Sequence, residues 1–296
     1  RNDVIGIFQY EGRATRLVNR EVRPDDFLEL SDINGLSRPG PLFSGTTAEY
    51  IRVKHGEVQP TRFHPIIDEL TGATKGQIIY QEQVLKALAE FGGLSVKRVH
   101  EIRRIISLKL GEAQFNTSSE DFITQAMSLH GVKRELAQAV WGRLVTSASY
   151  SFNIAHCISY AMLGFWCMFM KVHFPTAFYA AQLRKTDKDM WGRLIKDAER
   201  HKVKVNGVKP GISLVEWRPL DGSVYAGWKQ LDGVGKVTAE KIIAFDQEKR
   251  ESTGKGVKKA DELIAVNGIG VASIEKFREQ IDSDDPFGLL KIKHSL

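Results

Sequence analysis

The sequence predicts a mainly α-helical protein, in which a large helical domain is followed by a small module of helices with a few short strands. Apolar residues recur at helical spacing through most of the first two hundred positions. Glycine, proline and valine become frequent after Lys204, and a repeated glycine motif follows. We therefore expect a helical domain over residues 1–204, a linker and paired helical module over residues 205–282, and a C-terminal tail over residues 283–296.

Composition limits the class of protein and suggests a partner. The 296 residues are 42% hydrophobic and 26% charged, which is typical of a globular chain. The formal net charge of +6 favours an anionic partner, and nucleic acid is the first candidate. The two cysteines, Cys157 and Cys167, fit no zinc pattern or disulfide framework and are expected to be buried free thiols. Without a recognisable signal peptide or membrane-spanning run, we expect a cytoplasmic protein with no membrane partner.

The most informative segment is a long apolar block with polar residues at its start. Asn153, His156 and Tyr160 lie at the head of this predicted helix, and helical spacing puts His156 and Tyr160 on the same face. Nearly every residue in Cys157–Met170 is apolar, so we expect the helix to be buried and to hold its polar head rigidly. A core helix whose His and Tyr only bond their neighbours fits the same pattern.

A second helix, beginning after Ser95, is amphipathic with a cationic polar face. Adjacent Arg103 and Arg104 point about 100° apart on a helix, so the pair can straddle an anion. Guanidinium groups match phosphate oxygens well, whereas a solvated basic surface is the alternative interpretation. The cations of this face are Lys97, Arg98, Arg103, Arg104 and Lys109.

An internal repeat follows the predicted domain boundary. Gly233–Lys241 aligns with Gly268–Lys276, with both glycines, the β-branched centre, the hydroxyl, the Glu and the Lys in register. This is the form of a helix-hairpin-helix, whose glycines bring backbone N–H groups up to a phosphate without reading base sequence. A turn that only packs the module is the alternative. The predicted DNA-binding residues are Gly233, Gly235, Lys236, Gly268 and Gly270, and the first copy is favoured because Lys236 follows its glycines.

Acidic residues do not form a recognisable active site. Asp187 and Asp189 have a spacing seen in metal sites, but their place before a predicted helix favours a capping role. The sequence contains no phosphate-binding Walker loop and no nucleophile signature. We therefore expect no catalytic residue and no metal ligand in this chain.

A series of motifs, all in one order, resembles the C-family replicative polymerases of the DNA polymerase III alpha subunit type. Tyr80–Val84 repeats the family's YQEQV without change, and Arg103-Arg104 resembles its LRRAMGKK segment. The chain departs from the family at Ile154-Ala155, where the family has Lys-Ser. The other matching segments are Gly6–Gln9 (GVFQ), Arg38–Leu42 (RPGPL), Arg52–Gly56 (R-x-KHG), Phe152–Tyr160 (FNKSHAAAYA) and Lys171–Pro175 (KAHYP).

The resemblance implies that the chain is the fingers portion of a DNA-directed DNA polymerase, followed by a helix-hairpin-helix region. It implies that Arg103 and Arg104, helped by Lys109, grip the triphosphate of the incoming deoxynucleoside triphosphate (dNTP). Asn153 and His156 would lie near the nucleotide pocket.

Tyr160 would support these residues from the next turn of the helix. The alternative is a non-enzymatic DNA-binding protein that keeps a polymerase-derived scaffold.

The same resemblance implies partners and a cofactor. The partners would be primer–template DNA, the dNTPs and the palm and thumb of the same polymerase. A sliding clamp is a further candidate, suggested by the residues near Gln280. The catalytic Mg²⁺ ions would be held by palm aspartates that precede the segment at Gly6, outside this chain.

Overall fold

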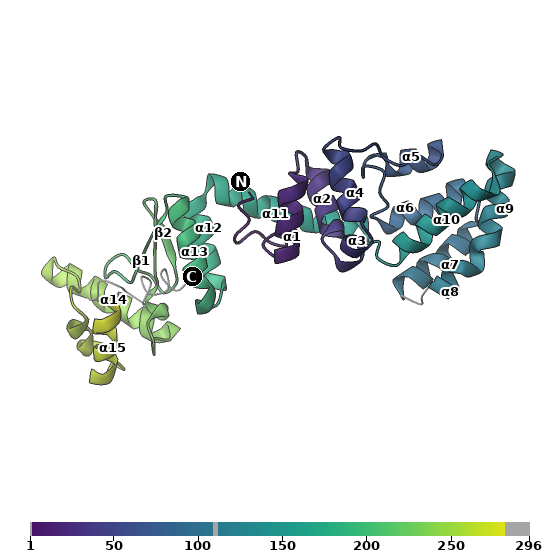
Figure 1. The fold of residues 1–296 in the computed structure, drawn as a ribbon. Helices are drawn as coiled ribbons and strands as arrows, with labels where there is room; N and C mark the ends of the chain where they lie inside the picture. The colour runs from purple at the N-terminus through teal and green to yellow at the C-terminus, as the bar shows by residue number, and fades with distance from the viewer. Residues whose placement is uncertain (1, 109–111, 282–296) are drawn as a thin grey trace. The chain divides into compact units, whose positions relative to one another are not determined.

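The computed structural model describes residues 2–108 and 112–281, and helices dominate it as predicted. Contacts divide the chain into two compact units, Arg1–Phe165 (unit 1) and Trp166–Leu296 (unit 2), and the division falls inside helix α11 (Ile154–His173). The predicted boundary after residue 204 stays a prediction. The other α-helices of unit 1 are α1 (Arg13–Val22), α2 (Phe27–Leu36), α3 (Pro39–Phe43), α4 (Thr46–Lys54), α5 (Pro65–Gly72), α6 (Gln81–Lys86), α7 (Val96–Ser107), α8 (Glu112–Phe115), α9 (Ser119–His130) and α10 (Arg134–Ala148) (Figure 1).

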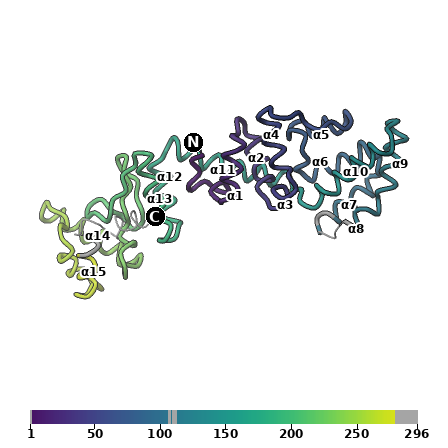
Figure 2. Tube along the Cα trace, in the orientation of Figure 1, coloured from purple at the N-terminus to yellow at the C-terminus, as the bar shows by residue number. Residues whose placement is uncertain are grey.

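Within unit 1, α1 to α4 gather beside the first part of α11 (Figures 1 and 2). The side-chain amide of Asn34 donates to the carbonyl of Cys157 in α11 at 3.3 Å. Gly164 allows close packing on the same face of α11, because a Cβ atom at this position would lie 2.5 Å from the ring of Tyr10. The glycine that interrupts the apolar block is therefore a packing position for an aromatic ring.

The remaining helices of unit 1, α5 to α10, surround a separate core with the π-helix η1 (Ala87–Phe91). Phe91 and Phe122 lie 5.7 Å apart between ring centroids, and Trp141 lies 5.0 Å from Phe122. The basic helix α7 contributes Ile102, which is fully buried, to the same core. Burial of each large apolar side chain contributes about 1.5–3 kcal/mol, so this core fixes which face of α7 remains in water.

A buried carboxylate links three segments near α11. Asp32, which is 2% exposed, accepts hydrogen bonds from the hydroxyl of Tyr50 at 2.7 Å and from that of Tyr80 at 2.6 Å. Burial raises the pKa of Asp32 to about 6, although the two tyrosine hydrogen bonds act in the opposite direction. Asp32 thus fixes the side chain of Tyr80, the first residue of the Tyr80–Val84 motif.

Unit 2 contains a small sheet, with helices that precede it and helices that follow it in the sequence. The helices α12 (Pro175–Lys185) and α13 (Lys188–Arg200) pack against three strands in the order β1 (Lys204–Asn206), β3 (Ser223–Tyr225), β2 (Arg218–Leu220). Strand β1 pairs parallel with β3, and β2 pairs antiparallel with β3. After the sheet come the 3₁₀ helices η3 (Trp228–Gln230) and η4 (Ala260–Ala265) and the longer helices α14 (Lys236–Thr253) and α15 (Val271–Ile281).

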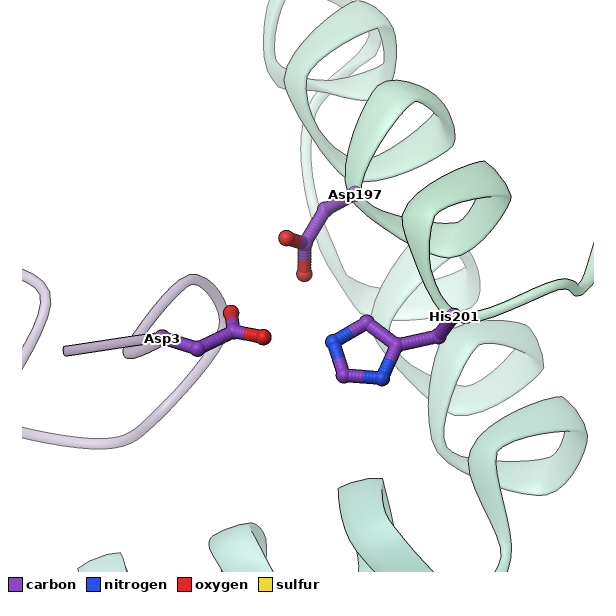
Figure 3. A group of neighbouring side chains, drawn as sticks. All are labelled: Asp3, Asp197 and His201. Atoms are coloured by element: carbon purple, nitrogen blue, oxygen red, sulfur yellow. The ribbon is translucent and has the colours of Figure 1, made fainter. Parts of the chain in front are cut away.

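A buried ion pair holds the second half of α11 in unit 2. The ammonium of Lys171 lies 2.7 Å from a carboxylate oxygen of Asp197, and both side chains are almost fully buried. The hydroxyl of Tyr179 donates to the same oxygen at 2.7 Å. Figure 3 shows Asp197 on α13, one helical turn before His201. Loss of one partner would leave a buried charge unpaired, so Lys171 requires Asp197.

The expectation that α11 is buried on all sides is wrong. One stripe of the helix is buried, formed by Cys157, Ala161, Gly164 and Lys171. The opposite face is exposed although it is apolar, because composition does not decide which face neighbouring elements cover. The large side chains of this exposed face are Met162, Leu163, Phe165, Trp166, Phe169, Met170 and Val172.

The same helix corrects two smaller expectations. By length and composition alone, α11 is long and apolar enough to cross a membrane, although the sequence analysis finds no membrane-spanning run. Both cysteines are free thiols as predicted, but Cys157 is buried and Cys167 only partly so.

Replacing Asp32 by Asn should change the pH dependence of stability. The raised pKa means that the folded state holds this proton more tightly than the unfolded chain does, so the stabilisation is complete below about pH 4. It is lost as the pH rises through about 6. We expect the wild type to gain thermal stability relative to Asp32→Asn between pH 7 and pH 5. If the difference in melting temperature between the two proteins is the same at pH 5, 6 and 7, this assignment is contradicted.

Candidate nucleotide and DNA interface

Two sequence motifs that lie more than 70 residues apart are joined at the head of α11. The backbone N–H of Gln81 donates to the carbonyl of Phe152 at 2.9 Å, and the N–H of Phe152 donates to the carbonyl of Ile79 at 3.1 Å. These bonds form an isolated parallel bridge between Tyr80 and Phe152. The bridge fixes where α11 begins relative to α6.

A carboxylate from the same motif caps the helix. One oxygen of Glu82 accepts from the side-chain amide of Asn153 at 2.8 Å, and the other accepts from the backbone N–H of Ile154 at 3.0 Å. Asn153 in turn accepts from the backbone N–H of His156 at 2.9 Å. The N–H groups of Ile154 and His156 in the first turn of α11 are therefore satisfied, and an anion lies at the positive end of the helix dipole.

This role of Glu82 was not predicted from the sequence. Glu82 and Asn153 are 71 positions apart, and no local pattern connects them. The available signal was the position of Glu82 inside the unchanged Tyr80–Val84 motif.

Aromatic rings form a continuous row of tilted and edge contacts beside the cap, and we call this row the stack. His156 lies 3.9 Å from Tyr160 between ring centroids and meets the edge of Phe152 at 4.9 Å. Phe8 extends the stack, 5.2 Å from Tyr160. At the other end, the guanidinium of Arg38 lies 3.8 Å from the centroid of Phe152. His156 is exposed and Tyr160 is partly buried, so this stack offers a planar ring and a nearby cation to solvent.

The two prolines and the glycine of Arg38–Leu42 favour a rigid break in the chain, but the segment after Arg38 is a short helix, α3. Pro39 occupies the first helical position, where its fixed φ and missing N–H are favourable. Gly40 makes room for Tyr150, since a Cβ atom at Gly40 would lie 2.4 Å from that of Tyr150. The hydroxyl of Tyr150 also lies 2.8 Å from that of Thr46. This packing positions Arg38 against the segment that leads into α11.

The cationic helix α7 presents Arg103 and Arg104 to solvent. Within residues 2–108 and 112–281, neither guanidinium has an acidic partner, whereas Arg98 pairs with Glu101 at 2.8 Å. Lys109 lies outside the described residues. Helix α7 packs against α6, α8 and η1, and among the described residues no hydrogen bond or ring contact joins it to the head of α11. The predicted nucleotide-binding residues therefore form two groups, one on α7 and one on α11.

The two glycine motifs of unit 2 fold alike. In each turn a backbone N–H bonds to the carbonyl three residues earlier, at 3.1 Å in the first copy and 3.0 Å in the second. Gly233 and Gly268 hold the third position with φ of 85° and 97°, which a type II turn requires. The next residues, Val234 and Ile269, are buried and anchor the turns. The two copies also agree in which side chains are buried: the pattern is the same at ten aligned positions, counted from Leu231 in the first copy and from Val266 in the second.

Neither backbone conformation nor packing requires the second glycine of each motif to be glycine. Neither Gly235 nor Gly270 has a positive φ, and a Cβ atom at either would meet no atom within 4 Å. Each is exposed and directly precedes a helix, α14 or α15. The Lys241 ammonium donates to the carbonyl of Asn267 at 3.3 Å, so the first copy contacts the turn of the second.

Comparison with known proteins agrees with these motifs. Residues 1–130 match the family described as the bacterial DNA polymerase III alpha subunit finger domain. Residues 1–130 are a C-family polymerase fingers region. The predicted resemblance is thereby confirmed for this part of the chain.

Curated relatives extend the similarity beyond the fingers region. DNA polymerase III subunit alpha of Halalkalibacterium halodurans is 35% identical over 181 residues, which are 61% of this chain and 16% of the relative. An error-prone DNA polymerase of Nocardia farcinica is 31% identical over 248 residues, covering 82% and 22%. DNA polymerase III subunit alpha of Aquifex aeolicus is 29% identical over 254 residues, covering 84% and 21%. The chain thus spans less than a quarter of the length of these relatives.

Replacing Glu82 by Gln should loosen the head of α11. The amide offers one acceptor in place of two and turns an NH₂ group toward a donor, so we expect a loss of about 1–3 kcal/mol in unfolding free energy. Hydrogen exchange at the amides of residues 154–157 should accelerate. Glu90→Gln is the matched control, because Glu90 is exposed on η1 and caps no helix. Equal effects of the two substitutions in urea titrations and exchange would contradict the capping role.

Proposed function

We propose that this chain is the fingers and DNA-binding portion of a replicative DNA-directed DNA polymerase, which binds the incoming dNTP and primer–template DNA. The observation that carries the proposal is the meeting of four separate motifs at the head of α11. Phe8, Arg38 and Glu82 each contact a different residue of the segment Phe152–Tyr160 there, although they are far apart in the sequence. The relatives named as DNA polymerases support the same assignment.

The stack at the head of α11 is the proposed site for the base and sugar of the nucleotide. His156 is exposed with its ring against Tyr160, so a planar base or a ribose ring can contact the same surface. Asn153 is a positioning residue in this proposal, since its carbonyl and amide are both engaged by the helix and by Glu82. The proposed nucleotide-binding residues of α11 are therefore His156 and Tyr160, held by Asn153.

The triphosphate requires cations elsewhere. A helix N-terminus commonly binds phosphate, but in α11 the carboxylate of Glu82 already accepts the N–H of Ile154. A second anion at that end would be repelled by this carboxylate. We therefore assign the phosphates to Arg103 and Arg104, which are exposed and free of acidic partners within the described residues, with Lys109 as a further candidate.

Closure of the fingers would bring the two groups to the same nucleotide. This would be the step that assembles the binding site.

The paired glycine turns are the proposed DNA-binding module. Gly235 and Gly270 leave the N-termini of α14 and α15 without a side chain, where a phosphate can approach the backbone N–H groups. Lys236 is exposed at the first turn and adds a cation. The positive φ at Gly233 and Gly268 sets the turn geometry, so these two residues act by shaping the site.

The donor set of the proposed nucleotide site does not fit a Mg²⁺ pair. Its carboxylate, Glu82, has both oxygens engaged by hydrogen bonds. Asp187 stands at the N-cap position of α13, as predicted, but makes no side-chain capping bond. Two-metal catalysis needs paired ligands, and we place these in the palm of the same polymerase, outside this chain. A cytoplasmic location and a sliding clamp as partner are parts of the same proposal.

Neutralising the α7 pair should impair nucleotide use more than DNA binding. In the complete polymerase, we expect Arg103→Gln with Arg104→Gln to lower dNTP incorporation about 10- to 100-fold, as loss of charge-assisted hydrogen bonds would. Arg98→Gln is the matched control, because Arg98 lies on the same helix but pairs with Glu101. Primer extension at graded dNTP concentrations and equilibrium DNA binding measure the two effects. An equal loss of DNA affinity would overturn the assignment to the triphosphate.

Adding a methyl group at the second glycines should weaken duplex binding. Gly235→Ala with Gly270→Ala places a Cβ atom in space that is open within this protein, so the turns should stay intact while a phosphate is kept at a distance. We expect at least a tenfold loss of affinity in fluorescence anisotropy with a labelled duplex. Gly142→Ala on α10 is the control, because the space around Gly142 is also open. Unchanged affinity would favour a purely structural role for the hairpins.

Primer extension separates the polymerase from a DNA-binding protein on a polymerase-derived scaffold. Joined to the palm-containing segment of a relative, the chain should support extension with Mg²⁺ and four dNTPs. DNA binding without any extension would favour the scaffold alternative.

A further inference from the structure

Helix α1 carries a row of arginines that neither proposed binding site uses. Arg13, Arg16 and Arg20 follow the i, i+3, i+7 spacing that places side chains on the same face of a helix. Arg23, directly after the helix, extends the row by one more turn. We call these four residues the arginine row. All four are exposed, while Val18 and Val22 are buried and hold the helix against unit 1.

The positive charge of the row is largely uncompensated. Within the described residues, Arg13, Arg16 and Arg23 have no acidic partner. Arg20 lies 3.0 Å from Glu21, but both side chains are more than half exposed, so this pair is weak. Asp25, the next acid in the chain, is engaged by Lys54 at 2.9 Å. An ordinary solvated surface would be expected to carry acids that neutralise its cations, whereas here one acid, Glu21, pairs weakly with the row and Asp25 is engaged by Lys54.

Arg23 has a backbone conformation that glycine would adopt at a lower cost in stability. It ends α1 with φ of 50° and ψ of 65°, the left-handed conformation that glycine adopts most easily. For a residue that has a Cβ atom, such as arginine, this backbone conformation costs about 1 kcal/mol of stability. The chain therefore keeps a cation at the end of the row at a small loss of stability, which points to a role beyond folding.

The row leads into a hollow at the C-terminal end of α1. This hollow, about 490 Å³ in volume, is lined by Arg20 and Arg23 together with Asn2, Asn19, Pro24 and Asp25. Asn2 and Asn19 bond to each other at 2.8 Å, and Asn2 also donates to the carbonyl of Arg16. These bonds hold the segment before α1 against the helix and fix one wall of the hollow.

The length of the row matches a nucleic-acid backbone. Ten residues of helix rise about 15 Å between Arg13 and Arg23. One strand of a duplex carries a phosphate about every 3.4 Å along its axis, so about four phosphates pass over this length. Four arginines can therefore face four phosphates in one strand, with guanidinium groups suited to phosphate oxygens.

We propose that the arginine row of α1 is a further DNA-binding surface, which holds the phosphate backbone of one nucleic-acid strand without reading its sequence. The inference rests on the proposed DNA-binding function, but its surface lies in unit 1 and shares no residue with the hairpins. Phosphate contacts of this kind set position and orientation and leave base recognition to other groups.

The test uses the full 296-residue chain and the slope of binding against salt. Each phosphate contact contributes about 0.9 to the slope of log K against log salt on duplex DNA and about 0.7 on a single strand. Arg16→Gln with Arg20→Gln should therefore reduce the slope by about 1.8 on a labelled 20-base-pair duplex or about 1.4 on the single strand. The arm that shows the larger loss of affinity identifies the bound form. Gln keeps helix propensity, so α1 should remain folded.

The matched control removes the same charge elsewhere in unit 1. Arg52→Gln with Arg62→Gln alters two exposed arginines that lie near Glu57 and Asp68, and its slope should stay unchanged. Equal slopes for the row variant, the control and the wild type would overturn the proposal. A slope lowered equally by both double variants would also overturn it, since net charge alone would explain the effect.

The hairpin variant Gly235→Ala with Gly270→Ala separates this proposal from the proposed function. If the hairpin variant loses affinity while the row variant keeps its slope, the hairpins bind DNA and the arginine row does not. If the row variant loses slope while the hairpin variant binds normally, the row is a DNA surface and the hairpin assignment fails.

Discussion

The carboxylate of Glu82 at the N-terminus of α11 is the interaction on which the arrangement of the fingers region depends. It satisfies the amide of Asn153 and the first free N–H of the helix, and the backbone bridge between Tyr80 and Phe152 fixes the same junction. Because a helix N-terminus carries partial positive charge, a carboxylate there is favourable by about 0.3–1 kcal/mol even at the surface. The position of His156 and Tyr160 follows from this cap.

Hydrogen bonds between buried polar groups stabilise that junction. Asp32 holds the hydroxyls of Tyr50 and Tyr80, and so ties α2 and α4 to the start of the Tyr80–Val84 motif. The rest of the motif is equally occupied: the amide oxygen of Gln83 accepts the N–H groups of Ile79 and Tyr80, both at 2.9 Å. A segment identical to the family motif is thus largely committed to structure.

Residues of the Arg52–Gly56 motif are likewise engaged in structural contacts. Lys54 forms ion pairs with Glu29 and Asp25, and its ammonium is almost fully buried. Burial by itself would raise the pKa of Glu29, but hydrogen bonds from Lys54, from the backbone of Asp25 and from Lys75 lower it. The ring of His55 lies 2.7 Å from the carbonyl of Glu21. These contacts fix the end of α4 against α1 and α2, and thereby fix the helix that carries the arginine row.

Local sequence determined the helices, the glycine turns and the family of the fingers region. The repeat from Gly233 and from Gly268 was predictable because a positive φ is a local requirement that glycine meets at little cost. The exposed cations of α7 were predictable because Ile102 and its helical neighbours had to face the core. The short helix α3 was missed because proline both interrupts and begins helices, and the sequence alone does not say which.

Tertiary structure decided what was distant in the chain or depended on coverage by neighbours. The cap from Glu82 to Asn153 and the ion pair from Lys171 to Asp197 join residues that no local pattern relates. The exposed apolar face of α11 could not be predicted either, since hydrophobicity states a preference for burial and packing decides whether it is met. Sequence fixes the local conformations of this protein, whereas the fold decides which side chains share a site, because long-range contacts depend on the whole packed chain.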